Sequence, residues 1–208
     1  MNIDFSGGAQ EWMAGFADYP SGQEAFYELR AGIEFLPAPL DTRKRGFLLS
    51  GNNHSDDLLA YMFHEINGLA PETSCALRCE IEFATDAPRD AFGIGGAPGE
   101  SVFLKVGAIN RTPTASLDEG GMLRLNADLG NQANGGREGV VLGNAANSRP
   151  AAEPRQYELK TLGNSNPLPA RTDASGRLWL IVAFDSGFEG STTLYVTRIG
   201  CHISITGT

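Results

Sequence analysis

Hydrophobic and polar positions alternate over much of this chain. The clearest example is Ser74–Ala84, where apolar residues occupy every second position and Arg78, Glu80 and Glu82 fall between them. A period of two is that of a β-strand with one buried face and one solvated face. The same pattern predicts strands over Tyr157–Leu162 and Met122–Ala127.

Other segments are apolar on both faces or have a mixed signal. Leu178–Phe184 is apolar throughout, which predicts a central strand covered on both sides. Ser55–Leu69 begins like a capped helix, but its aromatic and apolar residues alternate, and the Asn67-Gly68 turn and another strand follow, so we predict a strand. Asn144–Arg155 is polar and is predicted to be a loop. Further strands are expected at Ala25–Phe35, Phe47–Ser50, Ser101–Ile109, Val140–Leu142 and Thr192–Ile205.

About ten strands separated by turns, with almost no helical periodicity, indicate an all-β fold. The 26 glycines and 11 prolines are spread along the chain and punctuate short strands. There is no repeat of fixed period, which argues against a propeller or a solenoid. We therefore predict that residues 1–208 form a single domain, a two-sheet antiparallel β-sandwich of jelly-roll type.

The charge of the chain limits the classes of partner that we expect. The formal net charge is −9 and the sequence pI is about 4.8, whereas nucleic-acid binders carry a basic stripe. The one local basic cluster, Arg43-Lys44-Arg45, is interpreted as a solvated loop. No apolar run approaches the roughly 20 residues that span a bilayer. We expect no nucleic-acid partner and no membrane span; the sequence does not predict the oligomeric state.

The N-terminus, Met1–Gly8, has neither the basic start nor the apolar core of a signal peptide. The location therefore stays open between a cytoplasmic protein and one whose export signal precedes this sequence.

Three cysteines do not form a disulfide framework. Cys75 and Cys79 lie four residues apart on one predicted strand, about 13 Å from each other, which is too far for a bond. Cys201 can pair with either of them if their strands are neighbours. The preferred interpretation is three buried free thiols.

Several segments resemble a family of uncharacterised bacterial jelly-roll proteins, which are often exported or lipid-anchored. The matching segments are Trp12–Pro20, Ser50–Leu58, Gly93–Lys105, Asn126–Gln132 and Asp185–Gly190. The resemblance implies a jelly roll and an exported location, and it implies no particular activity. Phe5–Trp12 and Leu194–Ile199 are also similar to segments of carbohydrate-binding jelly-roll modules, which implies a possible glycan ligand.

Two polar clusters are candidate ligand-binding sites. One comprises Asn52, Asn53, His54, Asp56 and Asp57, where carboxylates next to a histidine suit a metal or a general base. The alternative is a solvated turn whose side chains bond their own backbone. The other cluster comprises Asn126, Asp128, Asn131 and Gln132, which is rich in oxygen but lacks the spacing of an EF-hand loop.

A third cluster directly follows the apolar strand. Asp185 and Glu189 lie four residues apart across Gly187 and are candidate ligands of a structural calcium ion. The alternative is a polar hairpin with a Ser186-Gly187 turn and solvated acids. No cofactor is implied with certainty.

No catalytic motif is present. The glycine-rich run Gly93–Gly99 leads to Glu100 and a strand, unlike a phosphate loop, and is interpreted as a structural turn. No Gly-x-Ser-x-Gly elbow occurs. The leading hypothesis is a non-catalytic ligand-binding or accessory domain, with a glycan as a candidate ligand.

Two alternatives remain. One is a polysaccharide hydrolase or lyase with paired acids, drawn from Asp56, Asp57, Asp128, Asp185 and Glu189. The other is a cell-surface structural or partner-binding protein. Convergence of the three polar clusters in space would favour a functional site.

Overall fold

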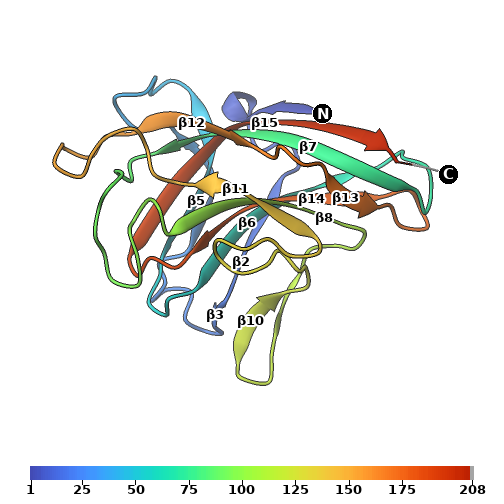
Figure 1. The fold of residues 1–208 in the computed structure, drawn as a ribbon, viewed down its shortest axis with the longest axis horizontal. Helices are drawn as coiled ribbons and strands as arrows, with labels where there is room; N and C mark the ends of the chain where they lie inside the picture. Colours follow the sequence, from blue (N-terminus) through green and yellow to red (C-terminus); the bar gives the residue numbers. More distant parts are fainter. Residues whose placement is uncertain (207–208) are drawn as a thin grey trace.

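The computed structural model describes residues 1–206 and stacks two antiparallel β-sheets (Figure 1). Sheet A has the strand order β12 (Glu158–Gly163), β7 (Ser74–Thr85), β15 (Ser191–Ile205), β5 (Arg45–Asn52) and β4 (Arg30–Phe35), with β1 (Asn2–Asp4) on β15 and β13 (Leu168–Arg171) on β7. Sheet B has the order β11 (Gly139–Asn144), β8 (Val102–Ile109), β14 (Leu178–Ser186), β6 (Leu58–Ile66) and β2 (Met13–Ala17).

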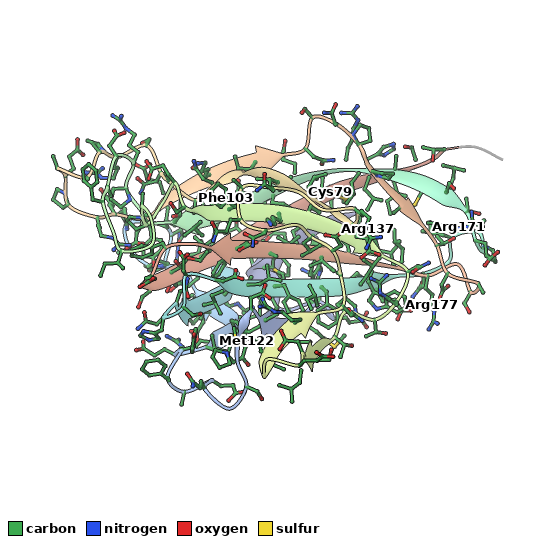
Figure 2. The ribbon with its side chains drawn as sticks, turned by 60° about the horizontal axis from the view of Figure 1, so that its bottom comes forward. Cys79, Phe103, Met122, Arg137, Arg171 and Arg177 are labelled. Carbon is green, nitrogen blue, oxygen red and sulfur yellow. A yellow bond between two sulfur atoms is a disulfide. The ribbon has the colours of Figure 1, made fainter. Side chains whose placement is uncertain are left out.

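A small third sheet lies on the outer side of sheet B. It has the order β3 (Tyr19–Pro20), β10 (Met122–Leu125) and β9 (Ala115–Leu117), and we call it sheet C. Met122 of its hairpin is labelled in Figure 2. The 3-10 helix η1 (Phe5–Gly7) follows β1. Among residues 1–206, no helix has the length and hydrophobicity needed to cross a membrane.

Successive long strands change sheet. The chain passes from β5 in sheet A to β6 in sheet B, back to β7, across to β8, and later from β14 to β15. The predicted fold is therefore confirmed: it is a two-sheet antiparallel β-sandwich of jelly-roll type.

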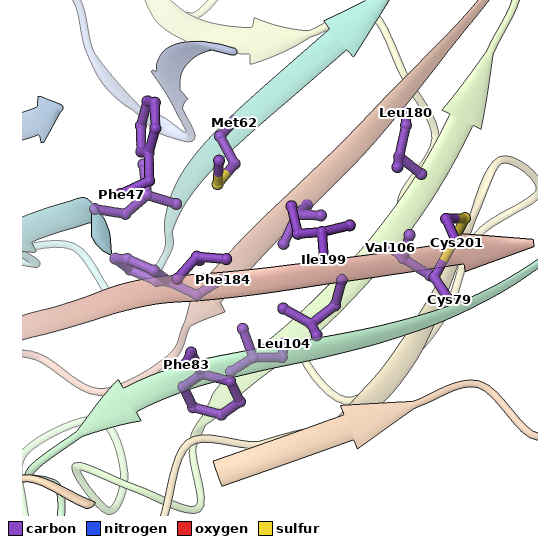
Figure 3. Close-up of a cluster of buried hydrophobic side chains, with 14 of the residues drawn as sticks. Phe47, Met62, Cys79, Phe83, Leu104, Val106, Leu180, Phe184, Ile199 and Cys201 are labelled. Carbon is purple, nitrogen blue, oxygen red and sulfur yellow. A yellow bond between two sulfur atoms is a disulfide. The ribbon is translucent and has the colours of Figure 1, made fainter. Parts of the chain in front are cut away.

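The main core lies between the two sheets. Figure 3 shows its side chains directed toward one another from both sheets, including Phe47 and Phe83 from sheet A and Met62 and Phe184 from sheet B. A second apolar cluster covers the other face of sheet B and includes Tyr61, Phe63, Trp179 and Ile181, which pack against Leu129 from the segment that covers them. β14 is therefore buried on both faces, as predicted.

Most predicted strands are confirmed, and the differences have local causes. The segment predicted as Ala25–Phe35 becomes a strand only at Arg30, because Tyr27 N–H donates to Gln23 O in a turn. The strands on either side of Asn67-Gly68 lie in different sheets, so this turn connects the two layers and closes no hairpin. Strands that the pattern did not predict are short or interrupted by glycine or proline: β1, β2, β3, β9 and β13.

The preferred interpretation of the cysteines was wrong. Cys79 and Cys201 form a disulfide, because β7 and β15 are neighbours and their register places the two residues opposite each other, with 4.1 Å between the Cα atoms. Cys75 remains a free, buried thiol.

Candidate functional site

The three polar clusters meet at one end of sheet B. Asn53 is 2% exposed, and its Nδ2 donates to Ser186 O at 2.9 Å and to Phe188 O at 3.1 Å. Gln132 joins the other two clusters, because its backbone N–H donates to Asp185 Oδ2 at 2.8 Å and its Nε2 donates to Asp56 O at 3.0 Å. Segments that are far apart in the sequence thus form one continuous polar region.

A buried ion pair organises this region. Lys105 Nζ lies 2.7 Å from Asp185 Oδ2, and both side chains are almost completely buried. The same ammonium donates to Leu129 O at 3.3 Å and to Asn134 O at 3.2 Å. Lys105 therefore fixes the segment that carries Asn131 against sheet B. Asp185 Oδ1 is buried and has no hydrogen-bond partner among the described residues.

A second set of charges lies beside the first. Arg124 of β10 donates from Nη1 to Asp18 Oδ1 at 2.6 Å, and the same atom lies 3.5 Å from Asp57 Oδ2. Its Nε donates to Asp118 at 3.2 Å. Arg124 thereby connects sheet C to both the β2–β3 junction and the start of β6.

The two acids on Arg124 have shifted pKa values. Burial, together with the negative charges of Asp18 and Asp185, raises the pKa of Asp57 to about 7, against the opposing effect of Arg124. Burial also raises the pKa of Asp18, although its hydrogen bond to Arg124 acts in the opposite direction. The arrangement brings together two carboxyl groups that share one guanidinium, one of which titrates near neutrality.

A pocket of about 370 Å³ opens at this cluster. Its polar lining includes Asp18, Arg124, Asp128 and Asn131, and Leu59 belongs to its apolar lining. The remaining lining residues are Leu125, Ala127, Leu129 and Gly130. The site can therefore offer hydrogen-bond donors and acceptors on one side and an apolar surface on the other.

The remaining candidate residues have mainly local contacts. His54 is exposed, stacks on Phe26 with 4.0 Å between ring centroids, and contacts Phe26 O through Nε2. Asn52 Nδ2 donates to Glu28 at 3.2 Å, and Asn126 Oδ1 accepts from Thr114 N–H in a loop. Asp128, although it lines the pocket, also pairs with Arg137 at 2.9 Å.

The segment after β14 is not the polar hairpin that the sequence offered as the alternative to a calcium site. β14 and β15 lie in different sheets, so the Ser186-Gly187 segment connects the two layers. Asp185 is 2% exposed rather than solvated, because it pairs with Lys105. Glu189 is half-buried, and its backbone N–H donates to Ile94 O.

The structural calcium ion stays a prediction. No group of three or more His, Cys, Asp or Glu side chains within residues 1–206 is arranged to hold a metal ion. A cation at Asp185 and Glu189 has to compete with the ammonium of Lys105, which already neutralises Asp185.

Three important residues were not among the sequence candidates: Asp18, Lys105 and Arg124. Lys105 lies within an apolar strand, where its charge was a signal of a buried partner. Arg124 occupies a polar position of an alternating strand, which is also typical of a solvated side chain. Asp18 lies in the segment Trp12–Pro20, which carries the family resemblance, but nothing in the sequence marked this residue itself.

Comparisons with known proteins show low similarity. No protein-family model matches the chain, and no curated protein matches it. Similar solved structures include carbohydrate-binding modules from the β-sandwich superfamily (11% identity, TM-score 0.44, covering 96% of this chain and 60% of that one). The carbohydrate-binding module TmCBM61 in complex with β-1,4-galactotriose is 9% identical, with a TM-score of 0.40 over 98% of this chain and 94% of that one.

A third similar structure is the K1 cleaved adhesin domain of Lys-gingipain from Porphyromonas gingivalis W83 (12% identity, TM-score 0.43, covering 100% and 98% of the two chains). The present chain spans 60% of the length of the first of these structures. Identities and TM-scores this low leave the function to be inferred from the side chains.

We predict that Lys105→Met lowers the free energy of unfolding by about 3–5 kcal/mol, because it leaves Asp185 buried without its partner. Denaturant unfolding measures this loss. The double variant Lys105→Met with Asp185→Leu should recover much of it, and Arg137→Met, which removes an exposed ion pair, is the matched control. Equal stability of Lys105→Met and the wild type would contradict a structural role for the pair.

The raised pKa of Asp57 predicts a stability that depends on pH. The folded state binds the Asp57 proton more tightly than the unfolded state, whose pKa is near 3.8, so this contribution is complete below about pH 4 and is lost as the pH rises to about 7. Asp57→Asn removes the titration. The variant should therefore gain stability relative to the wild type between pH 4 and pH 7, as measured by urea unfolding at several pH values; a constant difference would contradict the raised pKa.

Proposed function

We propose that this chain is a non-catalytic ligand-binding domain, and that the pocket beside Arg124 binds a small hydroxyl-rich ligand such as the end of a glycan. The observation that carries the proposal is the pocket itself, in which Asp18, Arg124 and Asn131 lie around an apolar surface that includes Leu59.

The lining suits the two kinds of surface that a sugar presents. Carboxylates accept hydrogen bonds from hydroxyl groups, a guanidinium donates two in a fixed geometry, and an amide does both. Apolar side chains such as Leu59 and Leu125 suit the C–H faces of a ring. The acids Asp18 and Asp128 disfavour an anionic ligand, so we propose a neutral one.

An exported location is part of the proposal. The Cys79–Cys201 disulfide supports it, because disulfides persist mainly in oxidising compartments.

The test is a glycan array followed by calorimetry with the sugars that bind. We expect Arg124→Leu to weaken binding by at least about ten-fold, which corresponds to 1.4 kcal/mol, because Arg124 both lines the pocket and holds Asp18. Arg155→Leu is the matched control, since Arg155 pairs with Asp86 and does not line the pocket. An array without a binder, or equal binding by both variants, would contradict the proposal.

A polysaccharide hydrolase is the second candidate. It is favoured by one observation: Asp18 and Asp57 contact the same Arg124 nitrogen, and Asp57 has a pKa of about 7, as a general acid requires. A cell-surface partner-binding protein remains a third possibility from the sequence.

Turnover separates the two leading candidates. Under the binding proposal we expect no release of reducing ends from any polysaccharide that binds. Release that falls at least about 100-fold in both Asp18→Asn and Asp57→Asn, with Asp118→Asn as the control, would establish the hydrolase instead.

A further inference from the structure

A groove crosses the outer face of sheet A, on the opposite side of the sandwich from the pocket. Two cavities, of about 510 and 470 Å³, share the lining residues Asn2, Glu80 and Gly200 and are therefore continuous. We call their union the sheet A groove. β7 and β15 form its floor, and β1 and β12 border it.

Two glycines, which have no side chains, keep the groove open. Gly200 of β15 and Gly163 of β12 both line it. A Cβ at Gly200 would meet Asn2 Oδ1 at 3.4 Å, an ordinary contact, so the backbone there tolerates a side chain and the groove would be filled by one. From Arg78 to Glu82 the floor extends about 13 Å along β7, which suits an extended ligand.

A β-bulge positions the polar groups of the floor. The register of β15 on β7 shifts between Val196 and Arg198, and Arg198 then lies opposite Glu82. Thr197, in the bulge, is 7% exposed, and its hydroxyl donates to Glu82 Oε1 at 2.7 Å. Bulges often direct side chains at functional sites, and here the bulge holds a carboxylate in the groove.

The groove has equal numbers of acidic and basic side chains, and most of them are not engaged in ion pairs with other described residues. Its lining contains three acidic side chains and three basic ones, in a chain of net charge −9: Asp4, Glu80, Glu82, Lys44, Arg78 and Arg198. Glu80, Glu82, Lys44 and Arg198 form no ion pair with any of the described residues. Apart from Glu82 Oε1, which accepts from Thr197, the donors and acceptors of these four side chains are thus free for a ligand, and the groove attracts neither a polyanion nor a polycation.

A peptide fits the groove less well than a polyhydroxylated chain. β7 is paired with β15 on one side and with β12 and β13 on the other, so the floor offers no free strand edge to a peptide backbone. Polar side chains, the glycine backbone and the exposed side chain of Leu159 face the ligand. Hydroxyl groups both donate and accept and match this lining.

We infer that the sheet A groove is a second binding site, which takes an extended, neutral oligosaccharide. This site is independent of the ligand of the pocket beside Arg124, since the two share no residue.

The test uses four neutral hexasaccharides as probes: β-1,4-linked glucose, xylose and mannose, and α-1,4-linked glucose. Titration of the ¹⁵N-labelled chain should shift the amide resonances of Glu80, Thr161, Arg198 and Gly200 with at least one probe. Gly200→Tyr fills the groove and should weaken this binding by at least about ten-fold. Arg198→Met, at an exposed side chain without an ion pair, should weaken it as well.

Ser204→Tyr is the matched control, because Ser204 is exposed on the same face of β15 and lies outside the groove. It should retain binding within about two-fold, and Arg124→Leu should leave the shifts of the groove unchanged whether or not the pocket binds sugar. The inference would be overturned by an absence of shifts in the groove with all four probes, by shifts confined to the pocket, or by equal losses in Gly200→Tyr and Ser204→Tyr.

Discussion

The buried contact between Lys105 and Asp185 is the interaction on which the polar end of sheet B depends. A charged pair out of water is tolerated only where further hydrogen bonds complete it. Here those bonds come from Gln132 N–H to the carboxylate and from the ammonium to Leu129 O and Asn134 O. The need to satisfy two buried charges therefore orders a long irregular segment, and that segment forms one wall of the pocket.

The sequence predicted the longer strands, but it did not predict which strands pair with one another. Alternation over Ser74–Ala84 and uniform hydrophobicity over Leu178–Phe184 are local properties, and the structure reproduces both. Whether a turn closes a hairpin or connects two layers depends on which faces the neighbouring strands bury. The residues of Asn67-Gly68 and Ser186-Gly187 are typical of hairpin turns, but here each of these turns connects one sheet to the other. The sequence therefore did not predict either crossing between the sheets.

The sequence predicted only part of the candidate site, because the rest depends on contacts between residues that are far apart in the chain. Asn53, Asp57 and Gln132 lie in polar loops and Asp185 lies near the end of β14, and such local groups of polar residues are visible in the chain. Arg124 acts through contacts with Asp18, more than 100 residues away, at a strand position that looks solvated. The disulfide likewise required knowledge that β7 and β15 are neighbours. What the sequence lacks in each case is the long-range register, which sets distances between side chains.

The burial of aromatic side chains separates the two faces of this sandwich chemically. Tyr61, Phe63 and Trp179 lie on the outer face of sheet B, where they would be available for stacking on a sugar ring, but sheet C and Leu129 cover them. Recognition on that side is therefore left to the polar rim around Arg124. On the outer face of sheet A, the groove is lined by charged side chains over a glycine-containing floor. Hence, among the described residues, no Phe, Tyr or Trp lines either the pocket or the sheet A groove, and a sugar ligand at either site would be selected by its pattern of hydroxyl groups.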